Sequence, residues 1–435
     1  MSLRPRRPTS TKLPSGELRK FVLIGVPALG LSIAATTLNA FVPVLARELT
    51  SSRAVIGALV SGEGCVSLLL PIWIGAASDR VETRLGARLP FMIGTAPVAA
   101  LALACMPFAR SIPVLAVAVG IYYLAYFTYY APYRALESDL VSRQHSGRAN
   151  AVVGIFRVLG MGGGLVGGAL LLQLWKPLPF WGAAAILILT TAVAVVGLRR
   201  LATRKSPDAP EGSAATRVWS LIRDHADIRC FMMANVLWQL TQTGLRAFIV
   251  LYLTQGLHRS FSFAAFAMGM VGAAAIIAAP VAGKLADRYG PFVVMRVVLV
   301  VFGIGLWIPT FTRSIVWLLA VLPITGLGGA MALSMPYTIL MRIMPRESHG
   351  ASAGLFDVSS GAGSLLGPLL TGVAIDVLHP LFASTDGYAA MWPVIGTSTL
   401  LSIAFLKNET RGASHRAHHL PHDPGGEPTA PSTLR

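Results

Sequence analysis

The hexapeptide "GAASDR" at Gly75–Arg80 recurs as "GKLADR" at Gly283–Arg288, and this repeat decides the fold. Two further pairs of segments repeat in the same chain order. The first pair is "APYRAL" at Ala131–Leu136 and "MPYTIL" at Met335–Leu340. The second pair is "HSGRANAVVGIFR" at His145–Arg157 and "SHGASAGLFD" at Ser348–Asp357. Each second copy follows its first at nearly the same spacing. Repetition at one long spacing predicts two structurally similar halves.

Long apolar runs surround these repeats. Of the 435 residues, 54% are hydrophobic and only 13% are charged, and the mean hydropathy is +0.64. This composition is typical of a polytopic membrane protein. The net charge of +17 comes from short basic clusters between the apolar runs rather than from a basic face with interleaved aromatics, so we expect no nucleic-acid partner. The three cysteines show neither paired nor metal-ligand spacing, and we expect no metal and no cofactor.

Apolar segments long enough to cross a hydrocarbon core of about 30 Å predict twelve transmembrane helices. We place them near residues 21–46, 54–77, 90–108, 112–136, 150–172, 178–198, 229–256, 263–285, 291–311, 316–341, 351–378 and 388–406. The expected fold is therefore an all-α membrane protein of two pseudo-repeated six-helix bundles. Its predicted parts are a tail at 1–20, an N-terminal bundle at 21–198, a polar linker at 199–228, a C-terminal bundle at 229–406 and a disordered tail at 407–435.

The basic residues predict the orientation in the membrane. Most of the 36 Lys and Arg lie in the two tails and in alternate loops, and few lie in the intervening loops. Because Lys and Arg accumulate in cytoplasmic loops, both termini are expected in the cytoplasm of a multi-pass protein of the plasma (inner) membrane. The histidines of the "HRAHHLPHD" tail are interpreted as part of a disordered segment rather than as a metal site. We expect a monomer.

The repeated G-x-x-x-D-R resembles the signature loop of the major facilitator superfamily. The first copy, extended by Arg84 and Arg88, resembles the sucrose:proton symporters and related glycoside:cation symporters. Their fourth span ends P-x-R-A-L-x-x-D-L, as Pro132–Leu140 does here. The resemblance implies twelve helices, a sugar-like substrate and alternating access to a midplane site. Tyr123 stands where that group has a proton-coupling aspartate, so coupling has moved or the driving ion differs.

Charged residues at the cytoplasmic span ends are predicted to form a gate. Asp79 and Asp287 could accept hydrogen bonds from a facing helix N-terminus and pair with arginines, and Arg134 shares a helical face with Glu137. The alternatives are solvated loop charges and an ordinary basic flank with a helical ion pair. The gating candidates are Gly75, Asp79, Arg80, Arg84, Arg88, Arg134, Glu137, Asp139, Gly283, Asp287 and Arg288.

Four ionisable residues lie deep in predicted spans, where a charge costs a few kcal/mol. Glu63 and Arg246 fall toward the outer half of the membrane, and Arg157 and Asp357 fall toward the inner half. Depth therefore suggests two opposite-charge pairs, each split between the two bundles. Glu63 or Asp357 is expected to carry the proton, because a carboxyl group in a low dielectric can have its pKa raised toward the working range. The alternative is a pair of static bridges.

Polar and aromatic side chains on the helices expected to line the cavity predict a binding site. Trp238 with Gln239 and Gln242 is the most sugar-like group, since sugars offer CH faces to aromatic rings and hydroxyls to amides. The tyrosines of span four are too dense to face one way, and half are expected to be packing. The substrate-binding candidates are Asn39, Tyr123, Tyr126, Trp238, Gln239 and Gln242.

The sequence contains no nucleophile–base arrangement, metal-ligand cluster or phosphate-binding glycine loop, so no enzyme is expected. We predict a secondary active transporter for proton-coupled uptake of a disaccharide or glycoside. An alternative is a proton-driven exporter of a small amphipathic metabolite or drug, and a more remote one is a non-transporting membrane sensor. The expected partners are the small-molecule substrate, a coupling proton or cation, and the lipid bilayer.

Overall fold

The structure, a computed structural model, describes residues 15–80, 83, 85–86, 88–141, 146–199, 221–344 and 352–406. In these ranges the regular structure is entirely helical. The predicted tail at 407–435, residues 1–14 of the other tail and most of the linker, residues 200–220, lie outside the described residues.

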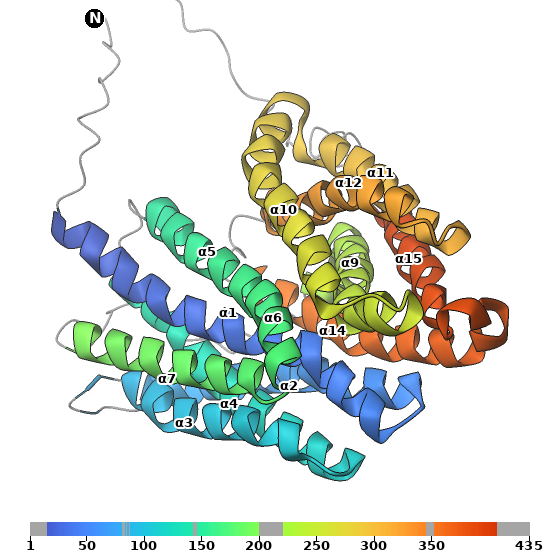
Figure 1. Cartoon of the computed structure of the whole chain (residues 1–435). Coiled ribbons are helices and arrows are strands. Elements are labelled where there is room, and N and C mark those ends of the chain that lie inside the picture. The colour runs from blue at the N-terminus through green and yellow to red at the C-terminus, as the bar shows by residue number, and fades with distance from the viewer. Residues whose placement is uncertain are drawn as a thin grey trace, which may run out of the picture.

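The first half of the chain forms one bundle, seen at the lower left of Figure 1. Its helices are α1 (Ser15–Leu49), α2 (Arg53–Arg80), α3 (Leu89–Cys105), α4 (Ile112–Leu140), α5 (Ser146–Gly162), α6 (Gly168–Leu174) and α7 (Leu178–Leu198). A π-helical turn, η2 (Gly163–Gly167), joins α5 to α6, so these two make one continuous rod. The run of glycines there leaves few side chains to hold a regular helix, and π turns form where the helical ladder is interrupted.

The second half forms the other bundle. Its helices are α9 (Ala226–Leu251), α10 (Phe261–Tyr289), α11 (Pro291–Phe311), α12 (Ile315–Ser334), α13 (Pro336–Ile343), α14 (Ser352–Val377) and α15 (Met391–Phe405). A π turn, η3 (Tyr252–Gly256), extends α9. The break between α12 and α13 falls at Pro336, which cannot donate a backbone hydrogen bond.

Each of the twelve predicted spans coincides with one helix or with two consecutive ones. Within the described residues, eleven helical segments are long and apolar enough to cross a membrane. The predicted span at 229–256, helix α9, is absent from that group because Gln239, Gln242 and Arg246 lower its hydropathy. Polar residues in a span are tolerated where they face other helices instead of lipid, and α9 packs against α14, α15 and α1.

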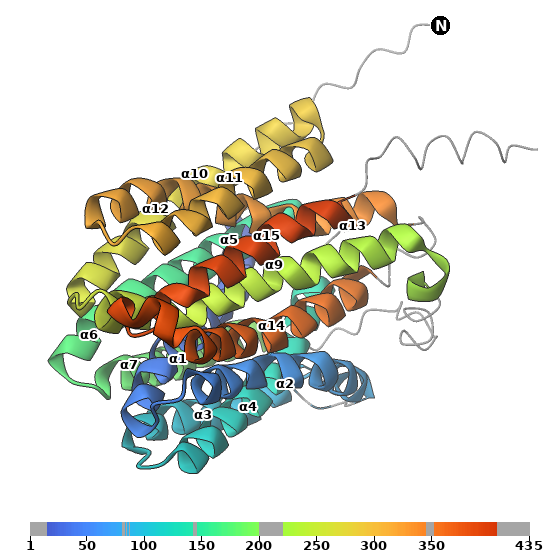
Figure 2. The same ribbon diagram turned by 90° about the vertical axis from the view of Figure 1, so that its right-hand side faces the viewer.

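The helices run back and forth, so the start of α1 and the end of α15 lie at one end of the bundle. We call this end the terminal face. The opposite end, which carries the α1–α2 connection and residues 378–388, is the distal face. Figure 2 shows the helices from the side, with α2, α3 and α4 of the first half at the bottom and α10, α11 and α12 of the second half at the top.

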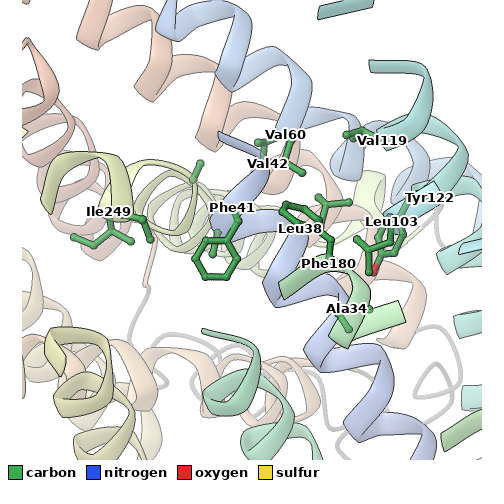
Figure 3. Close-up of a cluster of buried hydrophobic side chains, with 14 of the residues drawn as sticks. Ala34, Leu38, Phe41, Val42, Val60, Leu103, Val119, Tyr122, Phe180 and Ile249 are labelled. Atoms are coloured by element: carbon green, nitrogen blue, oxygen red, sulfur yellow. The ribbon is translucent and has the colours of Figure 1, made fainter. Parts of the chain in front are cut away.

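The largest apolar core runs through the first half and continues into the second, where it includes residues of α9, α10, α11, α12 and α15. Figure 3 shows part of it, where Leu103 of α3, Tyr122 of α4 and Phe180 of α7 come together beside Leu38 of α1. All four side chains are fully buried. Because lipid is as apolar as these side chains, close packing and internal hydrogen bonds hold such a bundle together.

The two halves meet along α2 and α14, which lie side by side in Figure 2. Glycines allow this contact. A Cβ atom on Gly64 of α2 would collide with the backbone of Leu365, and one on Gly372 of α14 would collide with the backbone carbonyl of Arg53. Small residues at a helix crossing let the two backbones approach closely. The α2–α14 contact is therefore tight from the distal face to the middle of the bundle.

Candidate functional site

A small pocket lies between the two halves, near the middle of the bundle. Asn39, Val60 and Glu63 line it from α1 and α2, and Thr243 and Arg246 line it from α9. The free cavity is about 10 Å³, room for about one water molecule, so the lining side chains nearly close the pocket in this structure. The pocket brings an acidic group from one half and a basic group from the other to the same place.

Hydrogen bonds fix the Glu63 carboxylate in the first half. The Asn39 amide donates from Nδ2 to Glu63 Oε2 over 2.9 Å, and the Tyr123 hydroxyl donates to Asn39 Oδ1 over 3.1 Å. Asn39 and Tyr123 are buried, at 7% and 2% exposure. Tyr123, at the position where the resemblance leads one to expect an aspartate, thus orients Asn39, which in turn orients Glu63.

Arg246 is held differently. Its Nε donates to the backbone carbonyl of Gln242 one turn earlier on α9, over 3.3 Å. In the described part of the chain no ion pair joins Glu63 to Arg246, although both line the pocket. The terminal nitrogens of the guanidinium are consequently available to a ligand or to Glu63.

An aromatic row on α4 runs from the pocket toward the terminal face. Tyr126 stacks on Tyr122 and on Tyr130, with ring centroids 5.8 and 5.7 Å apart, and the Arg134 guanidinium lies 5.8 Å from the Tyr130 ring. The charges of Glu63, Arg157 and Arg246 all act on Tyr126. Two other tyrosines of α4 are packing residues, since Tyr129 bonds to Thr191 of α7 and Tyr133 to Ile24 of α1.

The expected sugar-binding trio does not converge on one point. The Trp238 indole donates to Ser402 of α15 over 2.8 Å and is buried in the core of the second half. Gln239 donates to Ser360 of α14 over 3.4 Å, and Gln242 donates to the Gly329 carbonyl of α12 over 3.2 Å. The three side chains contact three different helices, and none lines the pocket.

A polar cluster joins the two halves at the distal face, and we call it the distal latch: Arg47, Ser52 and Arg53 from the first half, with Asp376 and Asp386 from the second. Arg53 Nη2 lies 2.6 Å from Asp386 Oδ2, and Arg47 Nη2 lies 3.2 Å from the same oxygen. Among the charged side chains of the latch, Arg53 is the most shielded, at 10% exposure, and Asp386 is the least, at 36%.

Asp376 of α14 caps helix α2 of the other half. Its carboxylate accepts the backbone N–H groups of Arg53 and Ala54, over 3.0 and 2.9 Å, and the Ser52 hydroxyl over 2.9 Å. The N–H groups of a first helical turn have no partner within the helix, and the helix dipole favours an anion there. Closing the distal face thus satisfies a helix terminus that separation would expose to water.

Asp386 lies outside the spans, between α14 and α15. Burial raises its pKa, but hydrogen bonds from Arg53, His379 and Arg47 outweigh burial and hold the pKa below the ordinary 3.8. Arg47 and Arg53 both act as fixed positive charges beside it. Asp386 is therefore ionised whenever the latch is closed near neutral pH.

A single ion pair, the terminal pair, crosses between the halves nearer the terminal face in the described ranges. Arg134 Nη1 of α4 lies 3.5 Å from Asp357 Oδ2 of α14, and the side chains are 45% and 47% exposed. Depth along the helices had suggested Arg157 as the partner of Asp357. In the structure the charge of Arg157 acts on Glu137 and Tyr133 of α4, within its own half.

The signature loop is only partly described. Gly75, Asp79 and Arg80 lie in the last turns of α2, Gly283, Asp287 and Arg288 lie in the last turns of α10, and Arg84 lies outside the described residues. Asp287 and Arg288 are exposed. Arg88 lies 3.4 Å from Asp139 at the end of α4, so this contact binds the loop to its own half.

Several residues of the site carried no recognisable sequence signal. Asp376 and Asp386 stand at or beyond a span end, where charges are ordinary, and their partners lie more than 300 positions away in the chain. Thr243 is one of many hydroxyls in apolar helices. The sequence did contain one signal of a close helix contact, the repeated small residues of α2 and α14. These are Gly57, Gly64, Gly361 and Gly372.

The curated relatives match short stretches of the chain. One is multidrug resistance protein 3 of Bacillus subtilis (strain 168), 33% identical over 97 residues, which are 22% of this chain and 19% of the relative. Another is the protein spinster of Drosophila melanogaster, 27% identical over 154 residues, which are 33% of this chain and 23% of the relative. The matched part spans about a fifth of the length of these relatives.

Solved structures match nearly the whole chain at low identity. A bacterial homologue of the human lysosomal transporter Spinster, in an inward-facing and occupied conformation, superposes with a TM-score of 0.66 at 16% identity, covering 91% of this chain and 95% of that one. The nucleoside transporter NupG superposes with a TM-score of 0.71 at 15% identity, covering 89% and 98%. At such identities the likeness shows the fold.

The family itself is shown by a match of the sequence to the Major Facilitator Superfamily over two overlapping stretches, residues 28–368 and 231–424. The match includes both copies of the repeated hexapeptide and most of the helices described above. Members of this family and the superposed structures are membrane transporters, not enzymes. The chain belongs to the Major Facilitator Superfamily and is a multi-pass membrane transporter.

Proposed function

We propose that the chain is a proton-coupled secondary transporter that works by alternating access. One observation carries the proposal: an acidic residue of the first half, Glu63, and a basic residue of the second, Arg246, line one pocket between the halves. A charge in a membrane interior is costly unless it serves binding or coupling. Groups that face each other across the halves can be bridged or separated as the halves rock.

The distal latch and the terminal pair supply the two gates in this proposal. With the distal latch closed, the pocket communicates with the terminal face once Arg134 separates from Asp357. With that pair remade and the latch broken, it communicates with the distal face. The distribution of Lys and Arg supports a cytoplasmic terminal face and the plasma (inner) membrane as the location.

The structure bears unequally on the two directions of transport. Uptake of a disaccharide or glycoside rests on the loop motifs, and the separation of Trp238 from Gln239 and Gln242 gives it little support. Export has support from a relative named a multidrug resistance protein. Both directions use the same coupling residue and the same gates, so the proposal holds for either.

Purified protein in proteoliposomes that enclose a pH-sensitive dye tests this function. Sucrose, maltose, uridine and ethidium are added in turn under an imposed pH gradient. We expect at least one to move together with protons, and the Glu63→Gln variant to lose proton movement. Asp224→Asn is a control, because Asp224 is exposed, pairs with its chain neighbour Arg223 and does not line the pocket. Solute flux that moves no protons in the wild type would contradict proton coupling.

A further inference from the structure

The charge balance of the pocket depends on the state of Glu63. When Glu63 is ionised, its charge and that of Arg246 compensate each other across the pocket, even without direct contact. When Glu63 takes up a proton, the guanidinium is left without a counter-charge inside the membrane. An uncompensated buried charge costs several kcal/mol. Something else in the pocket must then be negative.

The neighbours of Glu63 do not supply that negative charge. Helix α1 contributes the neutral amide of Asn39. Helix α4 contributes Tyr122, Tyr123 and Tyr126, which lie close enough for electrostatic interaction with Glu63. Helix α14 packs on α2 beside Glu63 through the Leu365 backbone and Gly361. Arg157 of α5, which acts on Tyr126, adds a further positive charge.

We propose that the pocket takes a small solute bearing a carboxylate or comparable anionic group, which Arg246 binds while Glu63 carries the proton. This inference rests on the proposed function and names its substrate class. The anion replaces the negative charge that protonation removes, so proton and solute each favour binding of the other. Arg246 suits this role because its terminal nitrogens form a planar fork that matches a carboxylate.

The return of the transporter without solute depends on the same charge balance between Glu63 and Arg246. After proton and anion leave, ionised Glu63 again compensates Arg246, and the halves can close over the pocket without a stranded charge. A proton together with a monovalent anion adds no net charge to the pocket. Transport is therefore electroneutral, whereas a neutral sugar with a proton would carry current.

The lining of the pocket limits the solute further. The free cavity in this structure is about 10 Å³, room for about one water molecule, so a solute enters only when the halves part around the pocket. The Thr243 hydroxyl and the Asn39 amide beside the charges can bond to hydroxyl groups of the solute. A small hydroxylated monocarboxylate, such as a sugar acid, has both the anionic group and the hydroxyl groups that this lining can bind.

Thermal unfolding of the purified full-length protein at mildly acidic pH tests the binding. The probes are matched pairs: glucuronate against glucose, galacturonate against galactose, and lactate against glycerol, with glucosamine as a cation. We expect at least one carboxylate to raise the melting temperature and its neutral partner to have no effect. Equal stabilisation by the neutral partners, stabilisation by glucosamine alone, or no stabilisation by any carboxylate would overturn the proposal.

The role of Arg246 is tested with the carboxylate that stabilises best. Loss of a hydrogen-bonded charge should weaken its apparent affinity about 10- to 100-fold in Arg246→Gln. Arg246→Lys should retain part of the affinity, and it replaces Arg246→Gln if that variant does not fold. Arg259→Gln, an exposed distal arginine, serves as the control. Unchanged affinity in both Arg246 variants would overturn the assignment.

Transport separates this inference from the proposed function. With the stabilising carboxylate outside proteoliposomes, lumenal acidification without current on a solid-supported membrane is the expected result. Current driven by a neutral sugar together with proton movement would overturn the anionic substrate while leaving proton coupling intact. Carboxylate uptake without proton movement would instead contradict the proposed function and leave the anion site standing.

Discussion

The two ends of the bundle hold the halves together in different ways. At the distal face, Arg53 is nearly buried and contacts Asp386 at 2.6 Å, and Asp376 caps the first turn of α2. Toward the terminal face, one 3.5 Å pair crosses the halves in the described ranges, between side chains that are almost half exposed. Exposed ion pairs contribute 0–1 kcal/mol, whereas shielded, multiply bonded ones contribute more.

This difference identifies the end that opens more easily. The glycine contacts of α2 with α14 add to the distal latch and extend to the middle of the bundle. Among the described residues, separation of the halves from the terminal face breaks one weak ion pair, and separation from the distal face breaks the latch and the helix contact together. The structure is thus a distal-closed state.

The largest effect is expected from Gly64→Ala. The added Cβ meets the Leu365 backbone, which cannot move aside as a flexible side chain can. Overpacking of a close contact costs about 1–3 kcal/mol, and at the upper end the distal-closed population falls about 100-fold relative to other states. Spin labels at Ser51 and Leu381, exposed on opposite halves of the distal face, would report a longer distance.

The control for this prediction is Gly94→Ala on α3, where an added Cβ meets nothing within 4 Å. It should leave the distal distance unchanged. An unchanged distance in Gly64→Ala as well would show that the α2–α14 contact does not hold the distal face closed.

A smaller loss is expected from Arg53→Gln. The change removes both ion pairs of Arg53, while the helix cap by Asp376 remains because it uses backbone N–H groups. Since the carboxylates are about a third exposed, we expect a cost of about 1–2 kcal/mol and roughly a tenfold shift away from the closed state. The same distal label pair measures it.

Lys176→Gln is the matched control for Arg53→Gln. It removes a distal ion pair of 2.7 Å to Glu48, but both partners belong to the first half. If the two variants shift the distal distance equally, the effect is a general loss of surface charge and the latch has no special part in closure.

Arg134→Gln should have a weaker effect on conformation. Its pair with Asp357 is long and half exposed, so its loss costs less than about 1 kcal/mol and opens the terminal face a few-fold. Labels at Arg148 and Tyr289, exposed near the terminal face on opposite halves, would report the change. Arg223→Gln, which removes an exposed local pair to Asp224, should not alter that distance. A shift larger than that of Arg53→Gln would reverse the comparison of the two ends.

The smallest effect is predicted for pH. The pKa of Asp386 is below its ordinary value in the latch, so its contribution to stability is complete above the ordinary pKa and is lost as the pH falls through the lowered one. Between pH 8 and pH 5 Asp386 stays ionised, and the distal distance of the substrate-free protein should not change. Opening within that interval would mean that another group of the latch titrates.

The sequence predicted the helices well, because hydropathy and length alone define apolar spans. Because a charge inside a membrane is costly, the sequence also indicated Glu63 and Arg246 as candidate functional residues. The structure places both at one pocket. Depth could not give the partner of Asp357, since rotation about the helix axis decides whether Arg134 or Arg157 faces it. The side chains of Trp238, Gln239 and Gln242 separate for the same reason.

The distal latch was outside the reach of sequence reasoning. A carboxylate that caps a facing helix was expected at the signature loop, from Asp79 or Asp287. The structure shows such a cap at the opposite end, where Asp376 caps α2, and a cap by Asp79 or Asp287 stays a prediction. Which helix terminus meets which carboxylate depends on the packing of the two halves, and a local sequence pattern does not predict that packing.

The most direct measurement of alternating access is the pair of distances in one cysteine-free protein, taken by electron–electron resonance in lipid nanodiscs. The label pairs are Ser51 with Leu381 at the distal face and Arg148 with Tyr289 at the terminal face. In the resting protein we expect a narrow, short distribution of distal distances and a broader distribution of terminal distances, and in Gly64→Ala we expect the reverse. Distances that lengthen together at both ends, or that do not change at either, would contradict alternating access built on these two gates.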